Sequence, residues 1–145
     1  MKAAAIAALI AFAAAAPAQA QMIEMGEADT ETRALIEGAL ADSLRESRAS
    51  GAQEQIYGAR ADLNGDGRPE ALGQVYSGFL CGAGVGCPIA VFEAKADGGY
   101  THVDTLGADA VTLLPTSSNG WRDLSLELQI GSFTVTWTGS GYAQR

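Results

Sequence analysis

The spacing of apolar residues changes at Gly51, and this change constrains the fold more than any other feature of the sequence. On the C-terminal side of Gly51, apolar and polar residues alternate, most clearly in residues 124–130 and 133–137. Alternation at a period of two is typical of a strand with one face in a core and the other in water. Both segments are therefore predicted as half-buried strands, joined by a short turn at Gly131 and Ser132.

Five more segments carry strand signals, namely residues 55–61, 70–77, 89–92, 100–104 and 111–114. Residues 89–92 are apolar on both faces, so we place them in a central strand. The last segment ends at Pro115, which is followed by a polar turn over residues 116–120. Because the links are short, strands that follow one another in the chain are expected to pair antiparallel.

One amphipathic helix of about four turns is predicted before Gly51. Asp29 or Thr30 can cap its N-terminus, and Glu31 favours the positive end of the helix dipole. Its apolar face is formed by Leu35, Ile36, Ala39, Leu40 and Leu44. The predicted fold class is thus α+β and mainly β, an antiparallel β-meander of about seven strands with this N-terminal helix packed on it.

The first twenty residues have the pattern of an export signal. Lys2 precedes an apolar run over residues 3–16, and Ala18-Gln19-Ala20 follows Pro17. Small residues in this arrangement are typical of a signal-peptidase site, and the run is too short and too rich in alanine for a membrane anchor. We expect a signal peptide over residues 1–20, a tether over 21–28 and a single domain over 29–145, located in the periplasm or secreted.

The charge balance limits the classes of partner. The chain has a formal net charge of −8, and loss of Lys2 with the signal would make it −9. Such a chain should avoid nucleic acid, and no segment after the signal is apolar enough to be embedded in a membrane. The acidic chain could attract an unknown basic protein or ligand, but a solvated acidic surface is the favoured interpretation.

The segment ADLNGDGRPE, residues 61–70, has the spacing of a calcium loop. Calcium takes six to eight oxygen ligands, which a tight loop supplies from alternate positions. Side-chain oxygens would come from Asp62, Asn64, Asp66 and Glu70, and a main-chain carbonyl from Arg68. The alternative is a plain hairpin turn, because Asn-Gly and Asp-Gly are strong turn formers. Calcium with a Kd of about 10⁻⁴–10⁻³ M is favoured because three carboxylates in phase would repel one another without a cation.

The same nine residues, DLNGDGRPE, resemble a known motif. They begin like an EF-hand loop but depart at the twelfth position, Gly73, and a strand follows instead of a helix. The closer resemblance is to the strand–loop–strand calcium motif of FG-GAP/VCBS-type repeats, Asp-x-Asn-x-Asp-Gly-x-x-Asp/Glu. It covers one hairpin, residues 57–76, and implies a structural calcium ion. It does not imply a propeller, because the chain has one copy.

Two cysteines, Cys81 and Cys87, flank a glycine-rich loop with the sequence CGAGVGC. A redox pair would have two residues between the cysteines, zinc would need two more soft ligands, and a phosphate loop would need a lysine and a following helix. Export to an oxidising compartment favours a disulfide that closes this loop, with a stabilisation of roughly 2–2.5 kcal/mol.

No set of catalytic residues is expected. His102, the only histidine, lies in a predicted strand without a nucleophile motif, so a surface position is favoured. The aromatic residues Trp121, Phe133, Trp137 and Tyr142 could form a ligand platform, although packing in the core and at sheet edges is the more frequent role.

The segments CGAGVGCPIAVFEA, LLPTSSNGWRDLSLEL and WTGSGY, together with the hairpin motif, resemble a group of small uncharacterised secreted bacterial proteins. This resemblance covers most of residues 57–142 and implies an exported location but no activity. We therefore expect a non-enzymatic binding or structural module, stabilised by calcium at residues 62–70 and by a disulfide. The alternative is a secreted inhibitor that caps a basic hydrolase with its acidic face.

Overall fold

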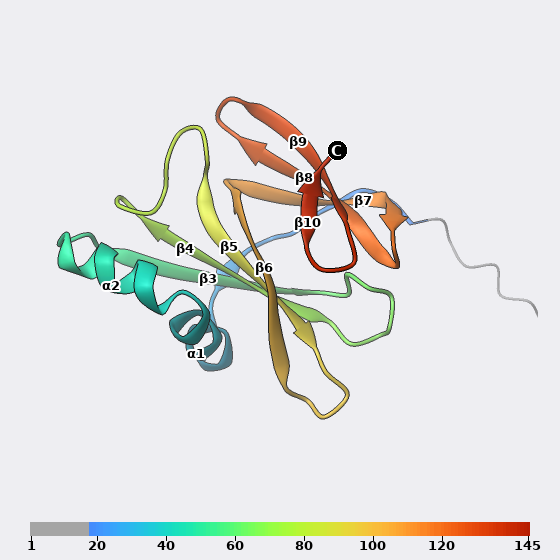
Figure 1. Ribbon diagram of the computed structural model, residues 1–145, viewed down its shortest axis with the longest axis horizontal. Helices are drawn as coiled ribbons and strands as arrows, with labels where there is room; N and C mark the ends of the chain where they lie inside the picture. Colours follow the sequence, from blue (N-terminus) through green and yellow to red (C-terminus); the bar gives the residue numbers. More distant parts are fainter. Residues whose placement is uncertain (1–17) are drawn as a thin grey trace, which may run out of the picture.

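The computed structural model describes residues 18–145 and shows two antiparallel β-sheets with a helical layer on the outer face of one of them (Figure 1). Residues 1–17, most of the predicted signal peptide, lie outside the described part. Along the chain the elements are β1 (Gln21–Met22), β2 (Gly26–Glu27), α1 (Thr30–Ala39), α2 (Ala41–Ala49), β3 (Glu54–Ala61), β4 (Glu70–Ser77), β5 (Cys87–Ala94), β6 (Tyr100–Ala108), β7 (Ala110–Ser118), β8 (Trp121–Leu128), β9 (Gly131–Trp137) and β10 (Tyr142–Gln144).

The prediction of one meander of about seven strands with one helix is wrong. The first sheet has the order β2-β3-β4-β5-β6 and the second has the order β1-β7-β8-β9-β10. The chain changes sheets at Asp109, between β6 and β7, where the Asp109 N–H donates to the Glu127 carbonyl of β8. Apolar alternation marks which side chains face a core, but a core between two sheets gives each strand the same alternation as a core beneath one sheet.

The first sheet is covered on both faces, which explains its apolar central strands. In β5, Ile89 and Val91 face the second sheet, whereas Ala90 and Phe92 face the helices. All four are buried. The prediction that residues 89–92 form a central strand is confirmed, because β5 lies between β4 and β6.

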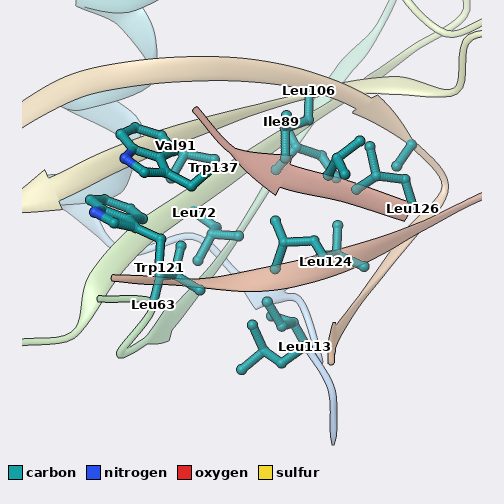
Figure 2. Close-up of a cluster of buried hydrophobic side chains, with 14 residues drawn as sticks. Leu63, Leu72, Ile89, Val91, Leu106, Leu113, Trp121, Leu124, Leu126 and Trp137 are labelled. Atoms are coloured by element: carbon teal, nitrogen blue, oxygen red, sulfur yellow. The ribbon is translucent and has the colours of Figure 1, made fainter. Parts of the chain in front are cut away.

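The main core lies between the two sheets (Figure 2). It combines side chains from both sheets with Leu63 from the β3–β4 loop. Figure 2 shows Leu72, Ile89 and Val91 facing Leu124 and the two stacked indole rings of Trp121 and Trp137. Because both sheets contribute to this core, they form one packed unit.

Two short helices replace the single predicted helix. α1 and α2 are separated by Leu40, whose φ of −113° and ψ of 25° lie outside the helical region. The break follows Gly38 by two residues, and glycine is a frequent cause of a helix bend. The predicted apolar face still reaches the sheet, because Ile36 and Leu44 are both buried. Asp29 is the N-cap, accepting the Thr32 N–H at 2.7 Å.

A pair of glycines provides the seat for α1. Gly58 of β3 and Gly73 of β4 are directly opposite each other in the register. A Cβ atom at Gly73 would lie 2.6 Å from the Ile36 side chain, and one at Gly58 would lie 3.1 Å from Thr32 Cγ2. The absence of side chains at both positions therefore lets the helix approach the sheet closely.

The segment 21–28, predicted as a tether, contributes one short strand to each sheet. β1 pairs with β7 and β2 pairs with β3, and Ile23 and Ala28 are buried. These two strands and β10 are two or three residues long. A period of two cannot be recognised in so few residues, which is why the sequence predicts seven strands and the structure has ten.

Two turns differ from their predicted places. β7 continues through Pro115, where the register with β8 shifts between Leu113 and Ser117, and the turn lies at Asn119 and Gly120. The β8–β9 turn precedes Gly131, so Ile130 is 67% exposed and is not part of a strand. Between residues 18 and 145, the structure has no helix that is long and apolar enough to cross a membrane.

Candidate functional site

The predicted calcium loop connects β3 to β4 as a hairpin. Ala61 pairs with Glu70, so residues 62–69 form the connection. Gly65 and Gly67 have φ values of 73° and 81°, which residues with a side chain rarely adopt. The Asn-Gly-Asp-Gly sequence thus provides the left-handed conformations that the loop requires.

The polar side chains of the loop accept hydrogen bonds from its own main chain. Asp62 Oδ1 and Oδ2 accept the N–H groups of Gly65 and Gly67 at 2.8 and 2.9 Å. Asn64 Oδ1 accepts the Asp66 N–H at 3.1 Å, and Asp66 Oδ1 accepts the Arg68 N–H at 2.7 Å. These bonds hold the loop in a defined shape without any added group.

Glu70 lies at the base of the loop and is fully buried. Its Oε2 atom accepts the Leu63 N–H at 2.7 Å, and its Oε1 atom accepts the Ala94 N–H at 3.4 Å. Burial raises the pKa of the Glu70 carboxyl above its ordinary value, and the Asp66 charge raises it further. The site therefore has one carboxylate inside the fold and the others at its surface.

Leu63 anchors the loop to the second sheet. Its side chain is buried in the core between the sheets. Its N–H donates to Glu70, and its carbonyl accepts the Arg122 N–H of β8 at 2.7 Å. The hairpin is consequently fixed to both sheets at its first residues.

Tyr142 is half-buried, and its hydroxyl donates to the Arg122 carbonyl at 3.0 Å. Burial raises the pKa of Tyr142 well above its usual range, and the charges of Glu70, Asp123 and Asp104 raise it further. Asp123 is buried, and its Oδ1 atom has no hydrogen-bond partner within residues 18–145. The Tyr142 hydroxyl therefore stays protonated and acts as a hydrogen-bond donor to the main chain.

The described residues do not form a preformed set of metal ligands. Within residues 18–145, no group of three or more His, Cys, Asp or Glu side chains is placed to hold a metal ion. In the loop, Asp66 forms an ion pair with Arg68 at 2.9 Å instead. Calcium at Asp62, Asn64, Asp66, Arg68 and Glu70 thus stays a prediction.

The disulfide prediction is confirmed. Cys81 and Cys87 are bonded, and Gly82 and Gly86 pair across the small loop that they close. Gly86 has a φ of 67° and lies against Ala108 of β6, where a Cβ atom would be 2.5 Å from the main chain. The glycines therefore allow the loop to pack directly on the neighbouring strand.

The remaining candidates are packing or surface residues. His102 is exposed, and its Nε2 atom lies 2.9 Å from Thr105 Oγ1. Trp121 and Trp137 stack at 4.2 Å between ring centroids and are buried, and Tyr142 meets Trp137 edge-on at 5.2 Å. Phe133 lies outside this cluster and is half-buried. The aromatic residues thus do not form a common exposed platform.

A groove that the sequence analysis did not predict lies where β1 and β2 diverge toward different sheets. Its volume is about 790 Å³, and its lining includes Glu24, Arg60, Asp62 and Arg122. No local pattern in the sequence indicates this groove, because its lining residues come from segments far apart in the chain. The groove is within the size range of small-molecule sites.

Comparison of the sequence with protein-family models and with curated proteins, and comparison of the structure with solved structures, found no match.

Proposed function

We propose that the protein is an exported, non-enzymatic binding or structural module whose residues 62–70 bind a calcium ion. The ion would join the β3–β4 hairpin to the interior at Glu70 and stabilise the contact between the two sheets. Its role would be structural, and binding of a further partner would occur elsewhere on the surface.

The observation that supports calcium best is the environment of Glu70. Its carboxylate is fully buried, and no Lys or Arg within residues 18–145 forms an ion pair with it. A buried carboxylate without a cation is costly, and its two main-chain hydrogen bonds offset only part of that cost. A divalent cation between Glu70 and the surface carboxylates of the loop would offset the remainder.

The hydrogen bonds within the loop are compatible with a bound ion. Each carboxylate oxygen has two lone pairs, so Asp62 can accept its main-chain N–H groups and still ligate a cation. The Arg68 guanidinium is ion-paired with Asp66 and would have to move away before Asp66 could bind calcium. Calcium binding is thus expected to exchange an exposed ion pair for a metal ligand, while the Arg68 main-chain carbonyl turns inward.

The non-enzymatic part of the proposal is supported by the position of His102. Its ring lies on the exposed side of β6 beside Thr105 and 5.4 Å from the ring of Phe92. A general base needs an orienting partner and a reacting group within hydrogen-bond reach in a concave site. His102 is not among the residues that line the groove of about 790 Å³.

Thermal unfolding of the exported protein tests the calcium site. In ~10 mM calcium, a site with a Kd of ~10⁻⁴ M should add about 2.7 kcal/mol relative to EDTA. For a domain of this size the melting temperature should rise by several degrees. Asp66→Ala should abolish the difference. An equal melting temperature in calcium and EDTA would mean that residues 62–70 form a hairpin turn only.

Arg68→Gln provides a sharper test, because it keeps the main-chain carbonyl but releases Asp66. Calcium should then bind about two- to fivefold more tightly, as expected from the loss of a competing surface ion pair. Calorimetric titration with calcium measures this change. Arg33→Gln is the matched control, because the ion pair of Arg33 with Glu27 lies outside the loop. A weaker affinity in Arg68→Gln would contradict the proposed exchange.

A further inference from the structure

Arg122 differs from the other arginines in its charge environment. Within residues 18–145, Arg33, Arg45, Arg48, Arg60 and Arg68 all form ion pairs with carboxylates, and Arg122 forms none. Lys95 and Arg145 also have no ion pair there but are exposed, whereas Arg122 is half-buried. A half-buried guanidinium without a counter-ion is unexpected in a chain with a net charge of −8.

The Arg122 side chain is bonded to main-chain carbonyls instead. Its Nε atom donates to the Leu114 carbonyl at 2.6 Å, and its Nη2 atom donates to the Gln19 carbonyl at 3.1 Å. Leu114 belongs to the adjacent strand β7 and fixes the guanidinium in place. Gln19 belongs to the segment before the predicted cleavage point, so its removal would leave Nη2 without this acceptor.

Arg122 of β8 and Arg60 of β3 both line the groove where β1 and β2 diverge. β2 pairs only with Tyr57 and Gly58 of β3, and the Ala28 N–H donates to the Ile56 carbonyl. Since alternate residues of a strand present their main-chain groups to the same side, the N–H and carbonyl of Arg60 also face outward. Arg60 lines the groove, and these main-chain groups have no strand partner among the described residues.

The groove is also lined by two carboxylates, which would favour hydrogen-bond donors in that part of a ligand. Glu24 and Asp62 line it together with Arg60 and Arg122. The positive charge of Arg60 is already balanced by Asp29 and Glu31, at 3.3 and 3.2 Å. Asp123 follows Arg122 in β8, where successive side chains point to opposite faces, and forms no ion pair with it. A ligand here would place an acceptor at Arg122 and donors near Glu24 and Asp62.

We propose that this groove binds an extended peptide that ends in a free carboxylate. The carboxylate bonds the Arg122 guanidinium, and the peptide main chain adds to the open edge of β3 at Arg60. Arginine suits a carboxylate because its planar N–H groups match the two oxygens, and strand addition to an open edge is a common mode of peptide binding. In the precursor, residues 18–20 occupy the Arg122 end through the Gln19 carbonyl.

This inference gives a ligand class to the binding module proposed above and rests on its export. The protein is therefore produced from the full chain in a bacterial host, and the intact mass of the exported form defines its N-terminus. Binding is then measured in EDTA, so that calcium plays no part. The probe is N-acetyl-Ala-Gln-Ala, which has the sequence of residues 18–20 and a free carboxylate.

The readout is the NMR signal of the Arg122 Nε–H group and of the Arg60 main-chain amide. The free acid should shift both signals in a saturable manner. The same peptide with a C-terminal amide should bind at least about tenfold more weakly, which corresponds to about 1.4 kcal/mol. Acetate should shift the Arg122 signal alone and bind more weakly than the peptide acid. Arg122→Gln should lose binding, and Arg145→Gln should retain it.

Several outcomes would overturn the proposal. An exported chain that retains Gln19 contradicts the export proposal and this inference together. A chain that begins at Gln21 but gives no shift at about 10 mM, ten times a weak Kd of ~1 mM, contradicts this inference alone. Equal binding of the peptide acid and amide excludes the role of Arg122, and equal binding of acetate and peptide excludes the strand edge. The comparisons of acid, amide and acetate use the unaltered protein, so they do not depend on how the variants fold.

Discussion

Glu70 illustrates how one buried carboxyl group connects local structure with stability. Its pKa in the folded protein is above the ordinary value of 4.5, with burial as the main cause. At a pH between the pKa of Glu70 in the unfolded chain and its higher pKa in the folded protein, the folded state binds more protons than the unfolded state. The free energy of unfolding therefore decreases as the pH rises through this window and increases as the pH falls toward 4.5.

The raised pKa of Glu70 should be visible in the pH dependence of stability. In EDTA, the wild type should become more stable as the pH is lowered from 7 toward about 4.5, and Glu70→Gln should lack this gain. Denaturant unfolding at several pH values measures the difference between the two proteins. Asp29 and Glu37 have lowered pKa values, caused chiefly by the Thr32 main-chain N–H and by Arg48. Their stabilisation is lost only below this window, so parallel curves for the two proteins would contradict the assignment.

The calcium contribution should have the opposite dependence on pH. The ion needs an ionised carboxylate, and proton and calcium therefore compete for Glu70. As the pH falls through the raised pKa of Glu70, the difference in melting temperature between calcium and EDTA should shrink. A difference that is constant over this range would place the ion away from Glu70.

Among the elements, α1 and the strands beneath it show how a helix position is specified by missing side chains. The opposed glycines Gly58 and Gly73 leave space for Thr32 and Ile36. The helix face was predictable from its apolar spacing. The role of Gly58 and Gly73 beneath the helix was not predictable, because a glycine in a strand indicates a close approach only once the approaching element is known.

Gly73→Ala should therefore destabilise the protein by about 1–3 kcal/mol, the usual cost of overpacking a core. The new Cβ atom would lie 2.6 Å from Ile36, which is buried and cannot move into solvent. Thermal or urea unfolding measures the loss. Adding Ile36→Val should recover part of it, as a double-mutant cycle would show.

Gly26→Ala is the matched control for this prediction. Gly26 is also in a strand, has no positive φ, and would place its Cβ atom in open space. Its stability should stay within about 0.5 kcal/mol of the wild type. Equal effects of the two substitutions would show that strand propensity, and not the contact with α1, determines the cost.

For the whole molecule, the two sheets differ in how completely they are covered. The first sheet has the helices on one face and the second sheet on the other, whereas the second sheet is covered on one face (Figure 1). Amides in β4 and β5 should therefore exchange with solvent most slowly, and those of β1, β2 and β10 most rapidly. Native-state hydrogen exchange measures this order. Slowest exchange in β8 and β9 would contradict it.

Seven strands were predictable because each is long enough to carry a local signal, such as the alternation of residues 124–130 or the apolar run of residues 89–92. The sequence did not predict the change of sheets at Asp109, because β6 and β7 have the same alternation as two strands of one sheet. For the candidate site, the hairpin and its loop were predictable from local turn chemistry. The burial of Glu70, the ion pair of Arg68 and the unpaired Arg122 depend on residues far apart in the chain, so no local pattern indicates them.

The two strands in residues 21–28 have a consequence for the order of assembly. A ribosome makes Gln21 early, but its partner Leu113 follows about 90 residues later. The first strand of the described chain is thus paired late, and until then the β7 edge of the second sheet lacks its N-terminal strand and can pair with another chain. The second sheet is therefore completed late, when β1 pairs with β7.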